Sequence, residues 1–192
     1  MKKYILIFFA LFSFSAIHAQ IEWTLSDDGT LTISGTSMPD YEVRNIGDSH
    51  YYIKLTCNAP WFPQQDKIKK VVIEDGVTDI GDCAFFCCTN LTSITIPNSV
   101  TCIGDDVFEC CGSLTSISIP NSVTSLGENA FFFCLGLTSI TFEGSTPPEF
   151  GKDVFYSVNK STPVYVPANS IEAYKEALKG YFEETSIQAL QR

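Results

Sequence analysis

The sequence is short of basic residues and of histidine. It has 12 Lys and Arg residues against 22 Asp and Glu residues, a formal net charge of −10, and only 2 His residues. Proteins that bind nucleic acids contact the phosphates through clusters of Lys and Arg. This shortage argues against a nucleic-acid partner, and the negative charge argues against binding to an anionic membrane surface.

The motifs of enzymes and metal sites are also missing. The sequence has no phosphate-binding glycine loop, no H-E-x-x-H, no EF-hand loop and no C-x-x-C pair. A Ser–His–Asp or Cys–His arrangement would have to use His50, because His18 lies in the leader described below. His50 sits in the polar stretch GDSHYYIK without a nucleophile motif, which favours a surface histidine. We expect no catalysis, no cofactor and no metal; an enzyme is the third hypothesis, resting on His50 and scattered acids.

Long apolar runs are absent except at the N-terminus. MKKYILIFFALFSFSAIHAQ has two lysines, an apolar run and a small-residue ending, which predicts a secretory signal peptide over residues 1–19 with Gln20 as the new N-terminus. A membrane anchor is the alternative, but the run is shorter than the ~20 residues that a span needs. No cysteine follows the cleavage site, which disfavours a lipid anchor. We expect an exported bacterial protein that is extracellular, on the cell surface or periplasmic.

What the sequence does contain is a repeat of 23 residues, which begins at Ile68, Leu91, Leu114 and Leu137. The first three units read IKKVVIEDGVTDIGDCAFFCCTN, LTSITIPNSVTCIGDDVFECCGS and LTSISIPNSVTSLGENAFFFCLG. The fourth starts as LTSITFEG, has an insertion around Pro147 and Pro148, and returns one residue late as GKDVF. A period of this length is typical of a solenoid.

The second unit shows how one coil folds. Leu91, Ile94 and Ile96 have the spacing of a short strand that faces inward. Pro97 ends that strand because it has no N–H to donate. The spacing of the later residues, repeated in each unit, predicts further inward positions at Val100, at Ile103 and at the phenylalanine that follows. Of the stacked Phe85, Phe108 and Phe131, we expect Phe108, in the middle, to be the most buried.

Each unit also predicts a sharp corner. Gly81, Gly104 and Gly127 recur at one position, where we expect φ above zero. Acidic residues or Asn follow each glycine, and we expect them to cap a short helical turn. Asp105 and Asp106 also resemble a general acid–base pair, but their recurrence at a corner favours capping.

A single coil is not stable alone. Burying an apolar side chain stabilises by ~1.5–3 kcal/mol, whereas ordering the backbone costs ~1–2 kcal/mol per residue. Stacked coils share hydrogen bonds and a common core, which closes the deficit. The repetition is therefore a structural necessity and says nothing about chemistry.

The unit LTSITIPNSVTxIGxxAFxxC resembles the BspA-type bacterial leucine-rich repeat. The resemblance covers residues 68–155 and extends to WTLSDDGTLTISG and APWF on one side and VYVPANSIEAYKEA on the other. It implies a right-handed, mainly β solenoid with short helical turns, found on or outside bacterial cells, and implicated in adhesion or protein binding. The chain has three clear units, whereas relatives often have many.

We expect four segments. They are a signal peptide at 1–19, an N-terminal cap at 20–67, three repeats at 68–136, and a divergent last repeat with a C-terminal cap at 137–192. The N-terminal cap should hold a β-hairpin that turns at Asp28-Gly29, fastened by Trp61 and Phe62. The C-terminal cap should hold a strand in PVYVP, a helix that starts with an Asn169–Glu172 capping box, and a last strand in SIQAL.

The 8 cysteines repeat with the coils. Cys88, Cys111 and Cys134 share one position; Cys87 and Cys110 share the position before it, where the third unit has Phe133. A position that accepts Cys or Phe selects apolar bulk, which favours reduced, buried thiols. Disulfides stay open, because stacked coils bring equivalent Cα atoms within the ~4.4–6.8 Å that a bridge allows, although parallel Cβ vectors give poor geometry. A Cys87–Cys110 bridge is the best exception.

The candidate binding surface is a row of small hydroxyl side chains on the outer face of the strands. We call it the hydroxyl strip; its members are Ser93, Thr95, Ser116, Ser118, Ser139 and Thr141. Plain β-propensity on a solvent face would also explain it. Phe86 and Phe132, just past the core Phe, point outward or lie partly under a loop, and are added as candidates.

These observations predict a non-catalytic module, secreted or on the cell surface, that recognises a protein or a glycan and functions in adhesion to a host. The alternative is a structural or self-assembly element of the cell envelope without an external ligand.

Overall fold

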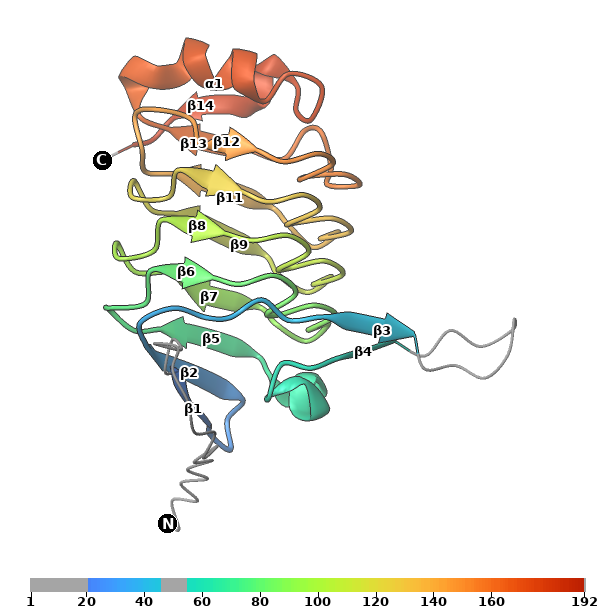
Figure 1. Ribbon diagram of the computed structural model, residues 1–192. Coiled ribbons are helices and arrows are strands. Elements are labelled where there is room, and N and C mark those ends of the chain that lie inside the picture. Colours follow the sequence, from blue (N-terminus) through green and yellow to red (C-terminus); the bar gives the residue numbers. More distant parts are fainter. Residues whose placement is uncertain (1–20, 46–54, 192) are drawn as a thin grey trace.

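The computed structural model describes residues 21–45 and 55–191, which form a solenoid (Figure 1). The coils stack in chain order from the hairpin near the N-terminus to the helix α1 at the other end. The predicted signal peptide, His50, Tyr51 and Tyr52 lie outside the described residues. Among those described, no helix is long and apolar enough to cross a membrane.

Two rows of parallel strands run along the solenoid, one strand of each row per coil. The first row contains β1 (Ile21–Leu25), β2 (Thr30–Gly35), β5 (Lys70–Ile73), β7 (Ser93–Thr95), β9 (Ser116–Ile119), β11 (Ser139–Phe142), β13 (Val164–Val166) and β14 (Ile187–Ala189). Only the β1–β2 pair in it is antiparallel. The second row contains β6 (Asp79–Ile80), β8 (Cys102–Ile103), β10 (Ser125–Leu126) and β12 (Glu149–Phe150). Val71 pairs with Ile94 and Ile117 with Ile140, each one period apart, which confirms the repeat register.

The remaining elements lie at the two ends. β3 (Val43–Asn45) and β4 (Leu55–Cys57) form a separate antiparallel pair, and η1 (Phe62–Lys67) precedes the first repeat. η2 (Ala168–Ser170), α1 (Ile171–Ala177) and η3 (Glu184–Ser186) complete the other end. The bodies of the repeats contain turns and no regular helix.

A ladder of aromatic rings runs through the core. Trp61, Phe85, Phe108, Phe131 and Phe155 stack in that order, with centroids 5.8, 5.5, 5.1 and 5.4 Å apart. The expectation that Phe108 is the most buried of the three central rings is wrong, because all three are 0% exposed. Trp61 and Phe155 extend the ladder at both ends and cover Phe85 and Phe131.

The corner glycines do not have positive φ, so the reason given for them from sequence is wrong. A Cβ on Gly104 would lie 2.3 Å from Asp82 Oδ1, and one on Gly127 would lie 2.3 Å from Asp105 Oδ1. Glycine is needed because the preceding coil occupies that space. Positive φ falls instead two residues later, at Cys83, Asp106, Asn129 and Asp153.

The acidic residues at the corner join coils rather than cap turns, which corrects a second expectation. Asp82 Oδ1 accepts a hydrogen bond from the Asp105 N–H at 2.7 Å, and Asp105 Oδ1 accepts one from the Glu128 N–H at 2.7 Å. Asp40 Oδ1 accepts from the Asp82 N–H at 3.2 Å, so the N-terminal segment continues the series. Each carboxylate satisfies a backbone donor of the next coil.

Both ends are capped much as expected. The hairpin turns at Gly29, which has φ +87°, and the Trp61 indole N–H donates to the Ala84 carbonyl at 2.7 Å. At the other end β13, α1 and β14 form as predicted. The predicted capping box does not: α1 begins after Ser170, and no side chain caps it, because η2 leads directly into it.

Candidate functional site

The hydroxyl strip lies on the outer face of the first strand row. Thr95, Ser116 and Ser118 are exposed, and Ser93, Ser139 and Thr141 are half-buried. The alternating residues Ile117, Ile119, Ile140 and Phe142 are buried, so the inward and outward faces follow the prediction. The row continues past Thr141 to Tyr165 and Gln188, which pair with it in register.

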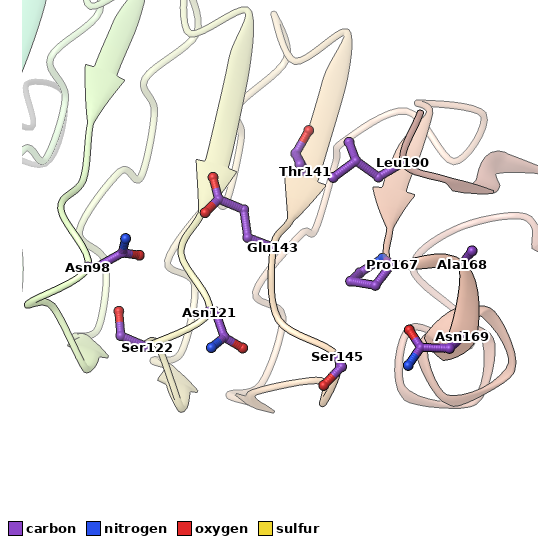
Figure 2. Close-up of a pocket in the computed structure, with 10 residues that line it drawn as sticks. All are labelled: Asn98, Asn121, Ser122, Thr141, Glu143, Ser145, Pro167, Ala168, Asn169 and Leu190. Atoms are coloured by element: carbon purple, nitrogen blue, oxygen red, sulfur yellow. The ribbon is translucent and has the colours of Figure 1, made fainter. Parts of the chain in front are cut away.

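An open groove of about 1240 Å³ adjoins the strip where the strands end (Figure 2). We call it the strand-end groove; it is lined by Asn98, Asn121, Ser122, Thr141, Glu143, Ser145, Pro167, Ala168, Asn169 and Leu190. All except Thr141 lie in the segments that follow β7, β9, β11, β13 and β14, with Ala168 and Asn169 in η2. The carboxyl ends of parallel strands meet at one edge, so stacking gathers these turns.

A second hollow of about 570 Å³ shares Asn98 and Glu143 with this groove and extends it toward Glu74 and Asp75. The polar surface therefore continues across several coils.

Glu143 is the one acid in the lining of the strand-end groove. It stands where Pro97, Pro120 and Pro167 stand in the neighbouring coils. Its Oε1 accepts a hydrogen bond from the Ser118 hydroxyl at 2.7 Å, which fixes the carboxylate beside the strip. Sequence reasoning missed Glu143, although an acid that replaces a repeated proline was a usable signal.

The insertion of the fourth unit forms the wall that carries Ser145. The Tyr174 hydroxyl donates to the carbonyls of Gly144 and Thr146, at 3.0 and 3.3 Å, from a fully buried ring. Burial raises the pKa of Tyr174 to about 12, so this hydroxyl stays a donor. The C-terminal helix thereby positions one side of the groove.

Several polar groups in the lining have no partner among the described residues. The side-chain amides of Asn98 and Asn121 make no hydrogen bond there, and the buried Ser122 hydroxyl also lacks one. The equivalent Ser99 hydroxyl, by contrast, donates to the Val77 carbonyl at 2.7 Å. The two amides are exposed and available to a ligand, whereas the Ser122 hydroxyl is buried.

The two candidate phenylalanines differ. Phe86 is only 5% exposed, so of its two predicted positions it has the covered one and not the solvent-exposed one. The N-terminal segment lies against its coil: the Tyr41 N–H donates to the Asp82 carbonyl, and Trp61 donates to Ala84. Phe132 is half-buried and stacks on Tyr156 with centroids 5.0 Å apart.

Phe132 belongs to an exposed aromatic cluster, whose grouping of surface candidates from two coils only the structure shows. The cluster consists of Phe132, Phe133 and Tyr156, with exposed fractions of 41% for Phe133 and 53% for Tyr156. Leu135 in the same turn is 65% exposed. Within residues 21–45 and 55–191, the N-terminal segment hydrogen-bonds to the coil of Phe86 and not to this one.

All eight cysteines are free thiols in the structure. Cys88, Cys111 and Cys134 are buried, and the last two donate to the Phe85 and Phe108 carbonyls at 3.2 and 3.1 Å. Cys87 and Cys110 are half-buried neighbours on adjacent coils. Burial raises the pKa of Cys87 and of Cys88 to about 12, which keeps both thiols protonated.

Two acids at and near the corner have perturbed pKa values, and burial is the largest cause of the raised pKa of Asp82. Burial, with a hydrogen bond that the protonated Glu109 carboxyl donates to Asp106, raises the pKa of Glu109 to about 7. Among the described residues, no group of three or more His, Cys, Asp or Glu side chains is arranged to hold a metal ion.

Comparison with known proteins identifies the repeat. Residues 56–185 match the family described as BspA type leucine rich repeat region, in six copies. A leucine-rich repeat protein from Eubacterium ventriosum is 26% identical, with a TM-score of 0.52 over 78% of this chain and 42% of that one. One from Bacteroides ovatus is 25% identical, with a TM-score of 0.50 over 66% of this chain and 31% of that one.

This chain therefore spans less than half the length of either solved protein. A search among curated proteins found no match. The repeats indicate a binding module. Since the matched repeats cover well over half of the residues, the chain belongs to the BspA type leucine rich repeat family.

Proposed function

We propose that the protein is an exported, non-catalytic binding module that recognises a protein or a glycan outside the bacterial cell. The observation that carries this proposal is the continuous polar surface made by the hydroxyl strip and the strand-end groove, which share Thr141. A rigid stack of coils holds this surface in place without a ligand, which lowers the entropy cost of binding.

The predicted signal peptide at 1–19 supports a location outside the cytoplasm. Adhesion to a host is the role that would follow from a binding surface on an exported bacterial protein.

The test is capture of partners by the purified full chain from panels of host matrix proteins and surface glycans. A double variant, Ser116→Tyr with Ser139→Tyr, fills the strip with bulky side chains that suit β-strands. It should lose at least tenfold in affinity for the captured partner while keeping its melting temperature.

The matched control places the same side chain beside the second strand row, as Thr101→Tyr with Thr124→Tyr. Both threonines are exposed, and each gives up one weak hydrogen bond to the preceding coil. This pair should bind normally. Capture of no partner, or a partner that ignores the strip variant, would contradict the proposal.

A second candidate function is self-assembly, and the exposed aromatic cluster favours it. Exposed rings of this kind are uncommon on a monomer surface. Light scattering over a concentration series should then show association, and Phe133→Ser with Tyr156→Ser should abolish it. A strict monomer at high concentration would rule this candidate out.

A further inference from the structure

We propose that the strand-end groove binds a neutral oligosaccharide. This inference rests on the proposed function and adds the ligand class and the residues that read it. The hydroxyl strip then forms the flank of the site, and the groove forms its specific part.

The side chains in the groove match the hydrogen bonding of sugars. A sugar hydroxyl both donates and accepts, so it pairs with side-chain amides and carboxylates alike. Asn98 and Asn121 present amides without a partner among the described residues, on adjacent coils. Glu143 adds acceptor oxygens and is held in place by Ser118.

An apolar wall stands beside these polar groups. Pro167, Ala168 and Leu190 line the far side of the groove, where the C–H faces of a sugar ring would rest. Tyr165, half-buried in an outward position next to Thr141, adds an aromatic ring at the margin. Sugar rings need both kinds of surface, because each has polar edges and an apolar face.

Charge and size separate this ligand from others. Neither hollow is lined by Lys, Arg or an aromatic residue, whereas protein interfaces are usually anchored by Trp, Tyr and Arg. Glu143, with Glu74 and Asp75 nearby, repels phosphate, sulfate and uronate groups. The volume of about 1240 Å³ exceeds the ~300–1,000 Å³ of ordinary small-molecule sites, which favours several linked sugar units over one.

The experiment measures binding of the full chain to neutral glucan, mannan, galactan and xylan oligosaccharides, with sulfated and uronate chains as the anionic set. We expect at least one neutral chain to bind and the anionic set not to bind. Asn121→Ala and Glu143→Gln should each weaken that binding by at least tenfold. Glu149→Gln is the matched control, because Glu149 is exposed on the second strand row, and should leave the binding unchanged.

A second readout is the side-chain amide NMR signals of Asn98 and Asn121, which should shift when the oligosaccharide binds. Preference for the anionic set, or neutral binding that both groove variants retain, overturns the inference. Capture of a protein through the strip, with no binding of any neutral oligosaccharide, overturns it too but leaves the proposed function standing. The melting temperature of each variant shows whether a loss comes from unfolding.

Discussion

At the scale of single residues, the aromatic ladder dominates the packing. Phe108 contacts a ring in the coil on either side, at 5.5 and 5.1 Å, and is 0% exposed. Neighbouring coils depend on such shared side chains because no coil buries its own apolar face alone. Loss of one ring therefore weakens two coil interfaces at once.

We predict that Phe108→Ala costs ~3–5 kcal/mol of unfolding free energy, as core Phe truncations usually do. That is a large part of a typical stability of ~5–15 kcal/mol. Thr95→Ala, on the exposed side of β7, should change stability by less than ~0.5 kcal/mol. Denaturant unfolding of both variants makes the comparison. Greater damage from Thr95→Ala would mean that the two faces are assigned the wrong way round.

The corner glycines allow a second prediction. A Cβ on Gly127 would lie 2.4 Å from the backbone carbon of Gly104, whereas one on Gly112 meets nothing within 4 Å. Gly127→Ala should therefore cost ~1–3 kcal/mol or more through overpacking. Gly112→Ala should be neutral or stabilising by ~0.4–1 kcal/mol, because the unfolded chain loses entropy. Thermal melts of the two variants test this difference. Equal melting temperatures for Gly127→Ala and Gly112→Ala would mean that close contact between coils is not the reason for glycine at 127.

Glu109 makes one contribution to stability pH-dependent. Its pKa is about 7 in the fold against 4.5 unperturbed, so the folded chain binds the proton more tightly. Between pH 4.5 and pH 7 the folded state therefore binds more protons at Glu109 than the unfolded state does. The stability that protonated Glu109 contributes is fully present below about pH 4.5 and is lost as the pH rises through 7. Glu109→Gln should therefore raise the melting temperature at pH 8 and leave it nearly unchanged at pH 4. An equal effect of the substitution on the melting temperature at pH 4 and pH 8 would show that Glu109 titrates at its ordinary pKa.

At the scale of the coil, thiol hydrogen bonds as well as apolar packing hold the turn after the core Phe. Cys111 and Cys134 each donate to a carbonyl of the preceding coil, at 3.2 and 3.1 Å. The thiols thus take part in coil stacking as well as filling volume. A disulfide is not needed for either role.

Thiol labelling tests this arrangement. Denatured, unreduced protein should expose all 8 thiols to an alkylating reagent. In the native protein the half-buried Cys87, Cys102 and Cys110 should react first. Cys88, Cys111 and Cys134 should react only on unfolding, since burial keeps them protonated and inaccessible. Mass spectrometry that finds three or four bridges would overturn the prediction.

At the scale of the whole molecule, the caps close a stack whose ends would otherwise be open. The hairpin β1–β2 covers one end of the first strand row, and β14 with α1 covers the other. An uncovered strand edge offers unpaired backbone groups to another chain. The C-terminal cap also forms part of the strand-end groove, to which it contributes Pro167, Ala168, Asn169 and Leu190.

We predict that a chain ending at residue 161 associates, because it exposes the edge of β11 and the apolar side of the last repeat. Light scattering should show large particles, whereas the full chain in the same buffer should not. A truncated chain that stays monomeric and folded would show that the repeats need no C-terminal cap.

The sequence by itself determined the period, the inward positions and the two caps. These follow from local pattern: the same apolar spacing returns every 23 residues, and only stacking can bury it. Leu91, Val100 and Phe108 are all fully buried, as their places in the unit predict. Family membership followed from the same residues.

Tertiary structure alone decided what identical positions do in different coils. Phe86 and Phe132 share a place in the unit, yet one is buried and the other joins an exposed cluster. The described part of the N-terminal segment lies against the first coil, which contains Phe86, and leaves the coil of Phe132 open. The groove likewise needs Asn121, Glu143 and Asn169 from three different turns side by side. Such proximity depends on stacking and on where the cap docks, and residues distant in sequence carry no local sign of it.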